Sequence, residues 1–501
     1  MTRRSAAFWA LALAFGLFTH LHGLGRTALW QDEAETAVLA RRVLKTGLPR
    51  VDDGVNLVSQ NQGRDHDARG LWDYSPWLPI YLAAGSIGLL GPGTFAARLP
   101  FALCALACLP LLFSLSRRWS GSEGTARLAV VLTLLSVPWL LFARQCRLYP
   151  LAALLALYLW WAYEEFLAER PHARLHVLLA SAALFHASFL VFFAVAGGLA
   201  LHFLAVEARR RMPERSDVTW AALIFLALLP GVVYFRVLAR AGGAGGVPVS
   251  YLGNLRALTR GLDLHVLPLL ALPGVLLALG DSARRLRPLA LLMGSLLTLV
   301  FAPQFFFRYL VVFIPLASHL LAEALSAAWR RLPAAAAAAG ALLLATNAWS
   351  VGAWLRKAPV LDSGLADMAA ELSAAPKDPV TAAVELLRRE GRPGELALVS
   401  YPDLPFMYYT PLKVVGGGQG WRRVEAADVA WVVVRGPAEK AALRLDWSRY
   451  ERVPLGVPDW PWGNRPDPDR HVFRTVAGAP EAAVYRRKRQ TDSTPADAAR
   501  Q

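Results

Sequence analysis

Three acidic side chains stand just after the first apolar segment of the chain, in "ALWQDEAETAVLARR" (28–42). Asp32, Glu33 and Glu35 lie within this short stretch. A carboxylate held at a helix start beside a membrane can act as a general base that takes a proton from an attacking hydroxyl group. Adjacent helical residues point in different directions, so Asp32 and Glu33 are expected to differ in role. One would meet a substrate, and the other would orient a neighbour or a metal.

The same spacing also permits a structural role. Apolar residues at helical spacing from Ala34 to Leu44, with Gly47 as a stop, predict a helix. Asp32 followed three residues later by Glu35 is similar to a capping box, in which Asp32 would cap the helix and Glu35 would reach back to it. Spacing alone leaves both interpretations open.

The elements that must position these acids are membrane spans. Of 501 residues, 55% are hydrophobic and 18% are charged. Apolar stretches long enough to cross a bilayer, which takes about 20 residues, recur as far as residue 355. We predict spans at 6–24, 94–116, 126–143, 148–164, 175–189, 190–206, 218–238, 263–280, 288–303, 308–328 and 333–355. The predicted fold class is a polytopic α-helical membrane protein with about 11 transmembrane helices and a C-terminal soluble α/β domain.

Arginine clusters between the spans set the topology. The formal net charge is +16, and the positive-inside rule accounts for it without a nucleic-acid partner. If the segment 77–91 stays on the outer surface as an interfacial helix, all clusters face the cytoplasm. They are Arg3 and Arg4; Arg117, Arg118 and Arg127; Arg170 and Arg174; Arg209–Arg211 and Arg215; Arg284, Arg285 and Arg287; and Arg330 and Arg331. The loop 25–93, the Gly-rich loop 240–262 and everything after 355 then face outward.

The composition changes after the last span. "DPVTAAVELLRREG" predicts an amphipathic helix with a glycine stop. The runs "ELALVS", "LKVVGG", "VAWVVVRG", "RYERVPL", "HVFRTV" and "AAVYRR" are typical of strands. We therefore divide the chain into a transmembrane catalytic domain (1–358), an extracytoplasmic α/β domain (359–489) and a disordered tail (490–501).

The segment "LWQDEAETAVLARRVLKTGLPRV" resembles the first outer loop of lipid-linked-sugar glycosyltransferases of the GT-C fold. The likeness is to the branch of bacterial aminoarabinose transferases and protein O-mannosyltransferases. It continues through "LWDYSPWLPIYLAAGSIGLLGPGTFAARLPFAL", "ARQCRLYPL" (143–151) and "FFFRYLVVFIPL" (305–316), in order, over roughly 1–355. The resemblance implies that Asp32 is the catalytic aspartate, with Glu33 beside it. The charged residues that often precede the aromatic-region proline in that branch are replaced by Tyr74 and Ser75, with Asp73 one place away.

The resemblance also indicates residues for substrate binding. Arg144, Arg147 and Arg308 stand where spans should meet the outer surface. A departing lipid phosphate needs fixed positive charge, and the arginine fork suits a phosphate; snorkelling at a span end is the structural alternative. Tyr149 and Tyr309 stand close to these arginines in sequence. They would either contact the substrate or belong to the aromatic belt at the membrane surface. The remaining substrate-binding candidates are Tyr149, Tyr309, Asp73 and Tyr74.

The predicted function is an inverting glycosyltransferase of a bacterial inner membrane, multi-pass, with its active site and C-terminal domain extracytoplasmic. A sugar would pass from a polyprenyl-phosphate donor to a lipid, glycan or protein acceptor. The alternatives are a transporter or flippase of a lipid-linked glycan, or a catalytically inactive assembly subunit with the GT-C fold. No cofactor is assigned; a divalent metal stays open, with Asp65, His66 and Asp67 as candidate ligands.

Overall fold

A computed structural model provides the architecture of the chain. It describes residues 3–61, 63–208, 214–241, 250–355, 358–362, 364–416, 429–435, 437–443, 445–460 and 464–488. The predicted tail 490–501 lies outside the described residues, as does the arginine cluster 209–211.

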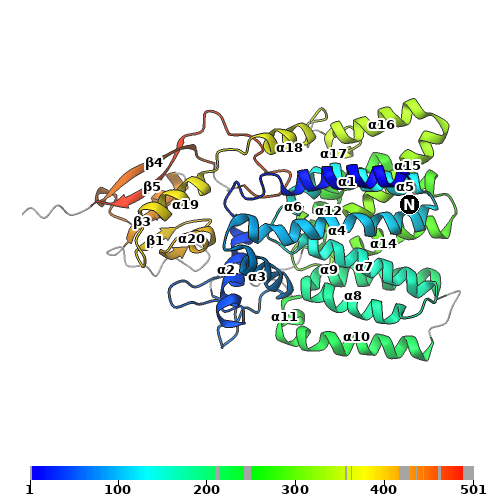
Figure 1. Cartoon of the computed structure of the whole chain (residues 1–501), viewed down its shortest axis with the longest axis horizontal. Helices are drawn as coiled ribbons and strands as arrows, with labels where there is room; N and C mark the ends of the chain where they lie inside the picture. The colour runs from blue at the N-terminus through cyan, green and yellow to red at the C-terminus, as the bar shows by residue number, and fades with distance from the viewer. Residues whose placement is uncertain are drawn as a thin grey trace, which may run out of the picture.

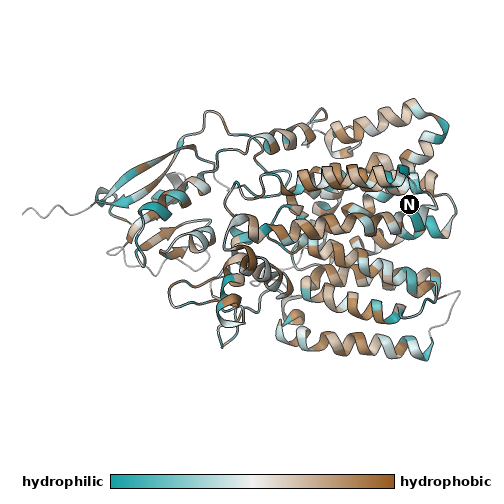
Figure 2. Ribbon diagram, in the orientation of Figure 1, coloured by the Kyte–Doolittle hydropathy of each residue, from teal (hydrophilic) through white to brown (hydrophobic). Residues whose placement is uncertain are grey.

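A helical bundle forms the larger part of the molecule, and a β-sheet stands at one end of it (Figure 1). The long bundle helices run along the long axis, with the N-terminus at the end far from the sheet (Figure 1). Hydrophobic residues predominate along these helices, whereas hydrophilic residues are more frequent in the sheet (Figure 2). The bundle contains α1 (Arg3–Leu21), α4 (Thr94–Ser120), α5 (Glu123–Leu135), α6 (Val137–Ala143), α7 (Tyr149–Leu167), α8 (Ala173–Ala187), α9 (Phe189–His202), α10 (Arg215–Tyr234), α11 (Val237–Ala241), α12 (Tyr251–His265), α13 (Leu272–Leu279), α14 (Ala283–Val300), α15 (Ile314–Arg331) and α16 (Pro333–Ala345).

A helix lies at each of the predicted span positions, but lengths differ. Among the described residues, four helices are long and apolar enough to cross a membrane, and six if each of two bent pairs counts as one span. The chain is thus a membrane protein with several apolar helices, and the number of eleven spans stays a prediction. The segment 77–91 forms α3 (Leu78–Leu90), whose 13 residues reach about 20 Å, less than the apolar thickness of a bilayer.

Prolines break two of the predicted spans. In the span 126–143, α5 meets α6 at 65°, because Pro138 cannot continue the hydrogen-bonding of the helix before it. In the second pair, α12 and α13 meet at 69° across Pro268. The predicted span 263–280 was therefore wrong in its start, which falls in the last turn of α12. The predicted loop 240–262 is also helical from Tyr251, since the Ser250 hydroxyl accepts a hydrogen bond from the backbone N–H of Gly253 at 3.2 Å and caps α12.

The C-terminal region carries a five-stranded mixed sheet in the order β2-β1-β3-β5-β4. Its strands are β1 (Leu396–Val399), β2 (Lys413–Gly416), β3 (Val429–Val433), β4 (Tyr450–Pro458) and β5 (Glu481–Arg487). β1 pairs in parallel with β2 and β3, and β5 pairs antiparallel with β3 and β4. The predicted helix is α19 (Pro379–Glu390), capped by Asp378. Around them lie α17 (Val351–Trp354), α18 (Gly364–Ser373), α20 (Leu404–Tyr409) and α21 (Pro437–Ala442).

The strand predicted at "HVFRTV" is absent, and this stretch is irregular within the described residues 464–488. The ring of His471 is bonded instead to the Glu371 carboxylate of α18, at 2.7 Å, and to the carbonyl oxygen of Arg465. This stretch therefore links the C-terminal region to α18 rather than extending the sheet.

The acidic segment lies between the bundle and the sheet. It forms α2 (Gln31–Thr46), which stands across the bundle axis beside α3 (Figure 1). One hydrophobic core joins α2 and α3 to α19, α20 and the first three strands, with Leu39, Trp72, Phe406 and Trp431 buried in it. The loop 25–93, which contains α2, and the C-terminal region are thus packed on each other. This shared core positions α2.

Several of the predicted cytoplasmic arginines meet at the opposite end of the bundle. Arg118 of α4 pairs with Glu164 of α7 at 3.5 Å, and Arg287 of α14 pairs with the same carboxylate at 2.7 Å. These contacts place charged residues of three helices together at this end of the bundle. That this end faces the cytoplasm stays a prediction.

Candidate functional site

The Asp32 carboxylate is paired with an arginine from a distant part of the chain. Its Oδ2 lies 2.6 Å from Nη1 of Arg308 and 3.9 Å from Nη2 of Arg147. Asp32 stands in the first turn of α2 and is 8% exposed. Arg308 lies in a 3-10 turn, η4 (Phe307–Tyr309), before α15. Arg147 lies in the bend between α6 and α7. Three segments separated by more than 100 residues in sequence therefore meet at one carboxylate.

Arg147 holds the first turn of α2 in place. Its Nη1 donates to the Asp32 carbonyl oxygen at 2.9 Å, to Glu35 Oε1 at 2.7 Å and to the Thr36 hydroxyl at 3.1 Å. Glu35 also accepts a hydrogen bond from Gln60. Burial raises the pKa of the Glu35 carboxyl above its ordinary value, and the charge of Arg147 opposes this. Arg147 is consequently occupied by the protein, whereas the side chain of Arg308 is 26% exposed.

Glu33 takes the capping role that the spacing assigned to Asp32 and Glu35. Helix α2 begins after Trp30, whose backbone N–H donates to Glu33 Oε2 at 3.2 Å. The capping-box interpretation of Asp32 and Glu35 is therefore wrong, because the helix starts at Gln31, two residues earlier than that interpretation requires. Asp32 is left free of a capping bond, and its carboxylate turns to Arg308.

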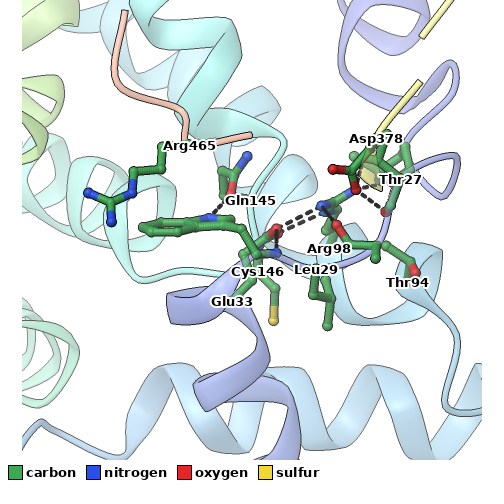
Figure 3. A network of polar contacts seen from close by, with 12 residues as sticks. Thr27, Leu29, Glu33, Thr94, Arg98, Gln145, Cys146, Asp378 and Arg465 are labelled. Carbon is green, nitrogen blue, oxygen red and sulfur yellow. Dashed lines mark hydrogen bonds and ion pairs between the residues drawn. The ribbon is translucent and has the colours of Figure 1, made fainter. Parts of the chain in front are cut away.

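Glu33 is fully buried and forms a two-pronged ion pair with Arg98 of α4. The two N–H···O distances are 2.8 and 2.7 Å, and the backbone N–H of Cys146 donates to Glu33 Oε1 at 2.6 Å (Figure 3). Arg98 also donates to the carbonyl oxygens of Leu24 and Ala28, at 2.9 and 3.2 Å. Glu33 thus fixes α2 to α4 and to the α6–α7 bend. Arg98 lies in the segment "GPGTFAARLPFAL", which contributes to the resemblance, but the sequence indicated no role for it in the site.

The predicted tyrosines lie around Arg308, the partner of Asp32. Tyr149, the first residue of α7, is within electrostatic reach of Arg308, Arg147 and Asp32. Burial raises the pKa of Tyr74, and the neighbouring Tyr309 and Glu35 raise it further. Tyr149, Tyr309 and Tyr74 are therefore brought together around Arg308.

Asp73 lies in the loop before α3, apart from the contacts of Asp32. It is buried, and its backbone N–H donates to the Asp65 carbonyl oxygen at 3.1 Å. The Asp65 carboxylate accepts from Ser59 at 2.6 Å, and Asp67 pairs with Arg69 at 2.9 Å. These carboxylates hold their own loop together. Among the described residues, no group of three or more His, Cys, Asp or Glu side chains has an arrangement that could hold a metal ion.

Arg144 bonds to the end of α1 and not to Asp32. It donates to the carbonyl oxygens of Thr19 and His22, at 2.6 and 2.8 Å, at the end of α1. There it lines a cleft between the α1–α2 connection and the C-terminal region. Of the three predicted arginines, two are brought to Asp32 and one to this cleft.

The C-terminal region supplies residues that the sequence did not indicate. Burial raises the pKa of Tyr401 to about 12, and the negative charge of Asp32 adds to the shift. The Tyr401 hydroxyl accepts a hydrogen bond from Arg465 Nη2 at 3.2 Å. Arg465 belongs to "PWGNRPDPDRH", which its prolines and turn-forming residues mark as a structural turn. The only feature of the sequence that could have indicated Arg465 as a site residue was its charge within such a turn.

The fold has counterparts among solved structures. ArnT from Cupriavidus metallidurans bound to undecaprenyl phosphate has a TM-score of 0.59 and 16% identity, over 92% of this chain and 97% of that chain. An Archaeoglobus fulgidus oligosaccharyltransferase tethered with an acceptor peptide has a TM-score of 0.55 and 12% identity, over 86% and 69%. Arabinofuranosyltransferase AftD from Mycobacteria has a TM-score of 0.50 and 17% identity, over 97% of this chain and 40% of that one.

No protein-family model matches the chain, and no curated protein sequence matches it. The solved structures are glycosyltransferases of the GT-C fold. At these low identities the likeness establishes the fold alone. The chain has the GT-C fold, as the ordered motifs of its membrane part predicted.

Proposed function

We propose that the chain is an inverting glycosyltransferase that takes a sugar from a polyprenyl-phosphate donor. The observation that carries the proposal is the contact between Asp32 and Arg308 at 2.6 Å. It places a carboxylate that can accept a proton beside a partly exposed guanidinium that can bind a phosphate. The fold supports it, since ArnT was solved with undecaprenyl phosphate bound.

In the proposed reaction, Asp32 takes the proton of an acceptor hydroxyl or similar nucleophile as that atom attacks C1 of the sugar. The bond from C1 to the phosphate oxygen breaks on the opposite face, so the anomeric configuration inverts. Its electron pair leaves with the lipid phosphate, and Arg308 stabilises the charge. The arriving phosphate would compete with Asp32 for Arg308, which would free Asp32 Oδ2 to meet the acceptor.

The other predicted residues receive separate roles. Arg147 would add positive charge beside the phosphate while it fixes the first turn of α2. Glu33, predicted as catalytic, is proposed as a positioning residue, because Arg98, Cys146 and Trp30 already occupy its carboxylate. Tyr149, Tyr309 and Tyr74 would border the donor headgroup. Asp73 would also contact the substrate.

The proposed location is a bacterial inner membrane, with α2 and the C-terminal region on the outer side. The contacts among Arg118, Arg287 and Glu164 at the other end of the bundle support this, since arginine gathers on the cytoplasmic side. Nucleotide sugars are absent outside the cell membrane, which is why a lipid-linked donor suits this orientation.

The proposal is tested with the purified chain in liposomes that contain a panel of polyprenyl-phosphate sugars. Acceptor-dependent release of polyprenyl phosphate, with a product of inverted anomeric configuration, is the expected result. A product of retained configuration would contradict the mechanism. Movement of the donor across the bilayer without transfer would favour a flippase, and no reaction with any donor would contradict the proposed enzyme.

A further inference from the structure

A groove between α5, α15 and α16 lies at the end of the bundle far from the sheet. Its volume is about 580 Å³, which is within the range of about 300–1,000 Å³ that ligand-binding sites have. Helix α16 stands at one edge of the bundle (Figure 1), and Ala336 is its one buried residue. The groove therefore borders a surface of the bundle that lipid surrounds in a membrane.

The lining of the groove changes from polar to apolar along α5 and α15. At the end of the bundle it includes Ser122, which caps α5, and Arg330, in the last turn of α15. More than one helical turn further inward it includes Leu128 of α5 and Leu325 of α15. A ligand with a polar head and an apolar chain matches this order.

Small residues of α16 leave room for an apolar chain. Ala336, Ala337 and Gly340 line the groove on this side. A Cβ atom built on Gly340 would come to 3.9 Å from the Leu325 side chain, so a larger residue there would take up the space between the two helices. Helices in membranes often pack closely through residues of this size. Here the same residues border an open groove.

Two arginines give the polar end a positive charge. The exposed side chain of Arg330 lines the groove. Arg284, at the start of α14, reaches the same place, because its Nη2 lies 2.9 Å from the position of a Cβ atom built on Gly121, the residue before Ser122. Neither arginine has an ion-pair partner among the residues that the structure describes.

The acidic residues nearby do not line the groove. The described residues that line it include neither Asp nor Glu. Glu123, in the first turn of α5, pairs with Arg127 at 2.5 Å. Glu323 of α15 is 2% exposed and lies outside the lining. The groove thus offers a net positive charge to a headgroup.

We propose that this groove binds an anionic glycerophospholipid from the leaflet at this end of the bundle. The phosphate meets Arg330 and Arg284, whose guanidinium groups can each donate two hydrogen bonds to phosphate oxygens. One acyl chain lies along Leu128, Leu325 and the small residues of α16. Basic pockets between membrane helices bind anionic headgroups, whereas a zwitterionic headgroup brings a further positive charge to the arginines. The inference goes beyond the proposed glycosyl transfer and does not depend on it.

The test is a titration of the purified full chain in detergent micelles with phosphatidylglycerol, followed by native mass spectrometry. The comparison lipid is phosphatidylcholine with the same acyl chains. Phosphatidylglycerol should bind about tenfold more tightly, because two arginines attract its net negative charge.

A first pair of variants asks where the lipid binds. Ala337→Trp fills the groove, and Ala338→Trp is the matched control at an exposed neighbouring alanine that does not line it. Ala337→Trp should weaken phosphatidylglycerol binding about tenfold or more, because the indole occupies the space of the acyl chain. Ala338→Trp should leave it unchanged. Undecaprenyl phosphate, whose proposed site is at Arg308, should bind equally to both.

A second pair of variants decides the question even if Ala337→Trp does not fold. Arg330→Gln removes a charge from the lining, and Arg331→Gln removes the same charge at an exposed position outside it. Arg330→Gln should weaken phosphatidylglycerol binding about tenfold, the loss of a hydrogen bond between charged groups, and Arg331→Gln far less.

Four results would overturn the proposal. They are equal binding of phosphatidylcholine and phosphatidylglycerol, equal losses in the two arginine variants, phosphatidylglycerol binding that survives in folded Ala337→Trp, and no binding of phosphatidylglycerol at all. Loss of undecaprenyl phosphate binding in folded Ala337→Trp would assign the groove to that lipid instead, and would also overturn it.

Discussion

The two arginines at Asp32 differ in what they leave available to a ligand. Arg147 is bound to Asp32, Glu35 and Thr36 of α2, while the Arg308 side chain makes a short contact with Asp32 and is 26% exposed. Arg308 also lies over the ring of Phe306, at 4.3 Å from its centroid. A guanidinium with free donors on a rigid support suits a phosphate that must be held in one orientation.

Arg308→Lys should weaken binding of undecaprenyl phosphate about tenfold. Lysine keeps the charge but loses the planar pair of donors, which is worth about 1.4 kcal/mol here. The measurement is a titration of the lipid followed by intrinsic fluorescence or thermal shift. Arg127→Lys is the matched control, since Arg127 pairs with Glu123 at the other end of the bundle. Equal affinity in both variants would contradict the role of Arg308.

Asp403 gives the C-terminal region a pH dependence. It is fully buried, and Oδ1 accepts a hydrogen bond from Gln31 Nε2 at 2.7 Å. Burial raises its pKa from 3.8 to about 6. Between these values the folded state keeps a proton that the unfolded state has released. Stability is therefore full at low pH and falls as the pH rises toward 6, by an amount on the order of 2–3 kcal/mol.

Asp403→Asn should remove that dependence, because the amide does not ionise. The unfolding temperature of the variant, relative to the wild type, should rise by several degrees between pH 4.5 and pH 7. Thermal unfolding of both proteins across this range provides the measurement, and groups common to both cancel in the difference. A constant difference would show that Asp403 does not ionise in this range.

At the residue scale the sequence indicated Asp32 and the two arginines that reach it. It could do so because the ordered motifs place them at outer span ends. It could not indicate Tyr401, which reaches the surroundings of Asp32 only after the C-terminal region has packed on α2, or Arg465, which bonds to Tyr401. It also misassigned the cap of α2, since the helix start at Gln31 is set by bonds from Arg98 and Cys146 in distant segments.

At the scale of elements, the Glu33–Arg98 pair decides where α2 stands. Both side chains are buried, and removal of one partner leaves an uncompensated charge, which typically costs 3–5 kcal/mol. Glu33→Gln and Arg98→Met should each lower stability strongly and reduce turnover through displacement of Asp32. Together they should cost less than their sum, with a coupling of about 2 kcal/mol.

A double-mutant cycle of unfolding free energies measures this coupling. The Arg127–Glu123 pair is the control, since it is exposed and joins neighbouring turns of one helix. The control variants should lose unfolding free energy additively. If the losses for Glu33→Gln and Arg98→Met were also additive, the pair would not fix α2.

The elements themselves were partly predictable. Apolar stretches gave a helix at each expected position, and alternating runs gave all five strands. The breaks at Pro138 and Pro268 were missed because hydropathy windows average over a proline. The run "HVFRTV" has the composition of a strand, but its contacts with α18 take precedence over its propensity.

At the scale of the molecule, the C-terminal region and the loop 25–93 behave as one packed unit. Asn56 connects them: its Nδ2 donates to the Leu412 carbonyl oxygen at 3.0 Å, and its Oδ1 accepts from the Val414 N–H at 2.7 Å. Its side chain is buried, so both groups depend on it. A sequence-based boundary at 358/359 separates chain segments but does not describe this shared core.

Asn56→Ala should loosen both partners at once. The two backbone groups left unpaired cost about 2–4 kcal/mol together. Hydrogen exchange should accelerate in β2 and in α2 by similar factors, whereas Asn61→Ala, at an exposed position in the same loop, should leave both unchanged. Acceleration in β2 alone would show that the C-terminal region folds independently of α2.

The central claim is that Asp32 is the base of a glycosyl transfer. The direct measurement compares the wild type and Asp32→Asn in liposomes, with donor binding and single-turnover transfer recorded on the same samples. Asp52→Asn, at an exposed position of the same loop, is the control. The account predicts that Asp32→Asn binds donor within about threefold of the wild type but transfers sugar 10²- to 10⁴-fold more slowly, the range of general-base catalysis. Transfer at the wild-type rate by folded Asp32→Asn would contradict it.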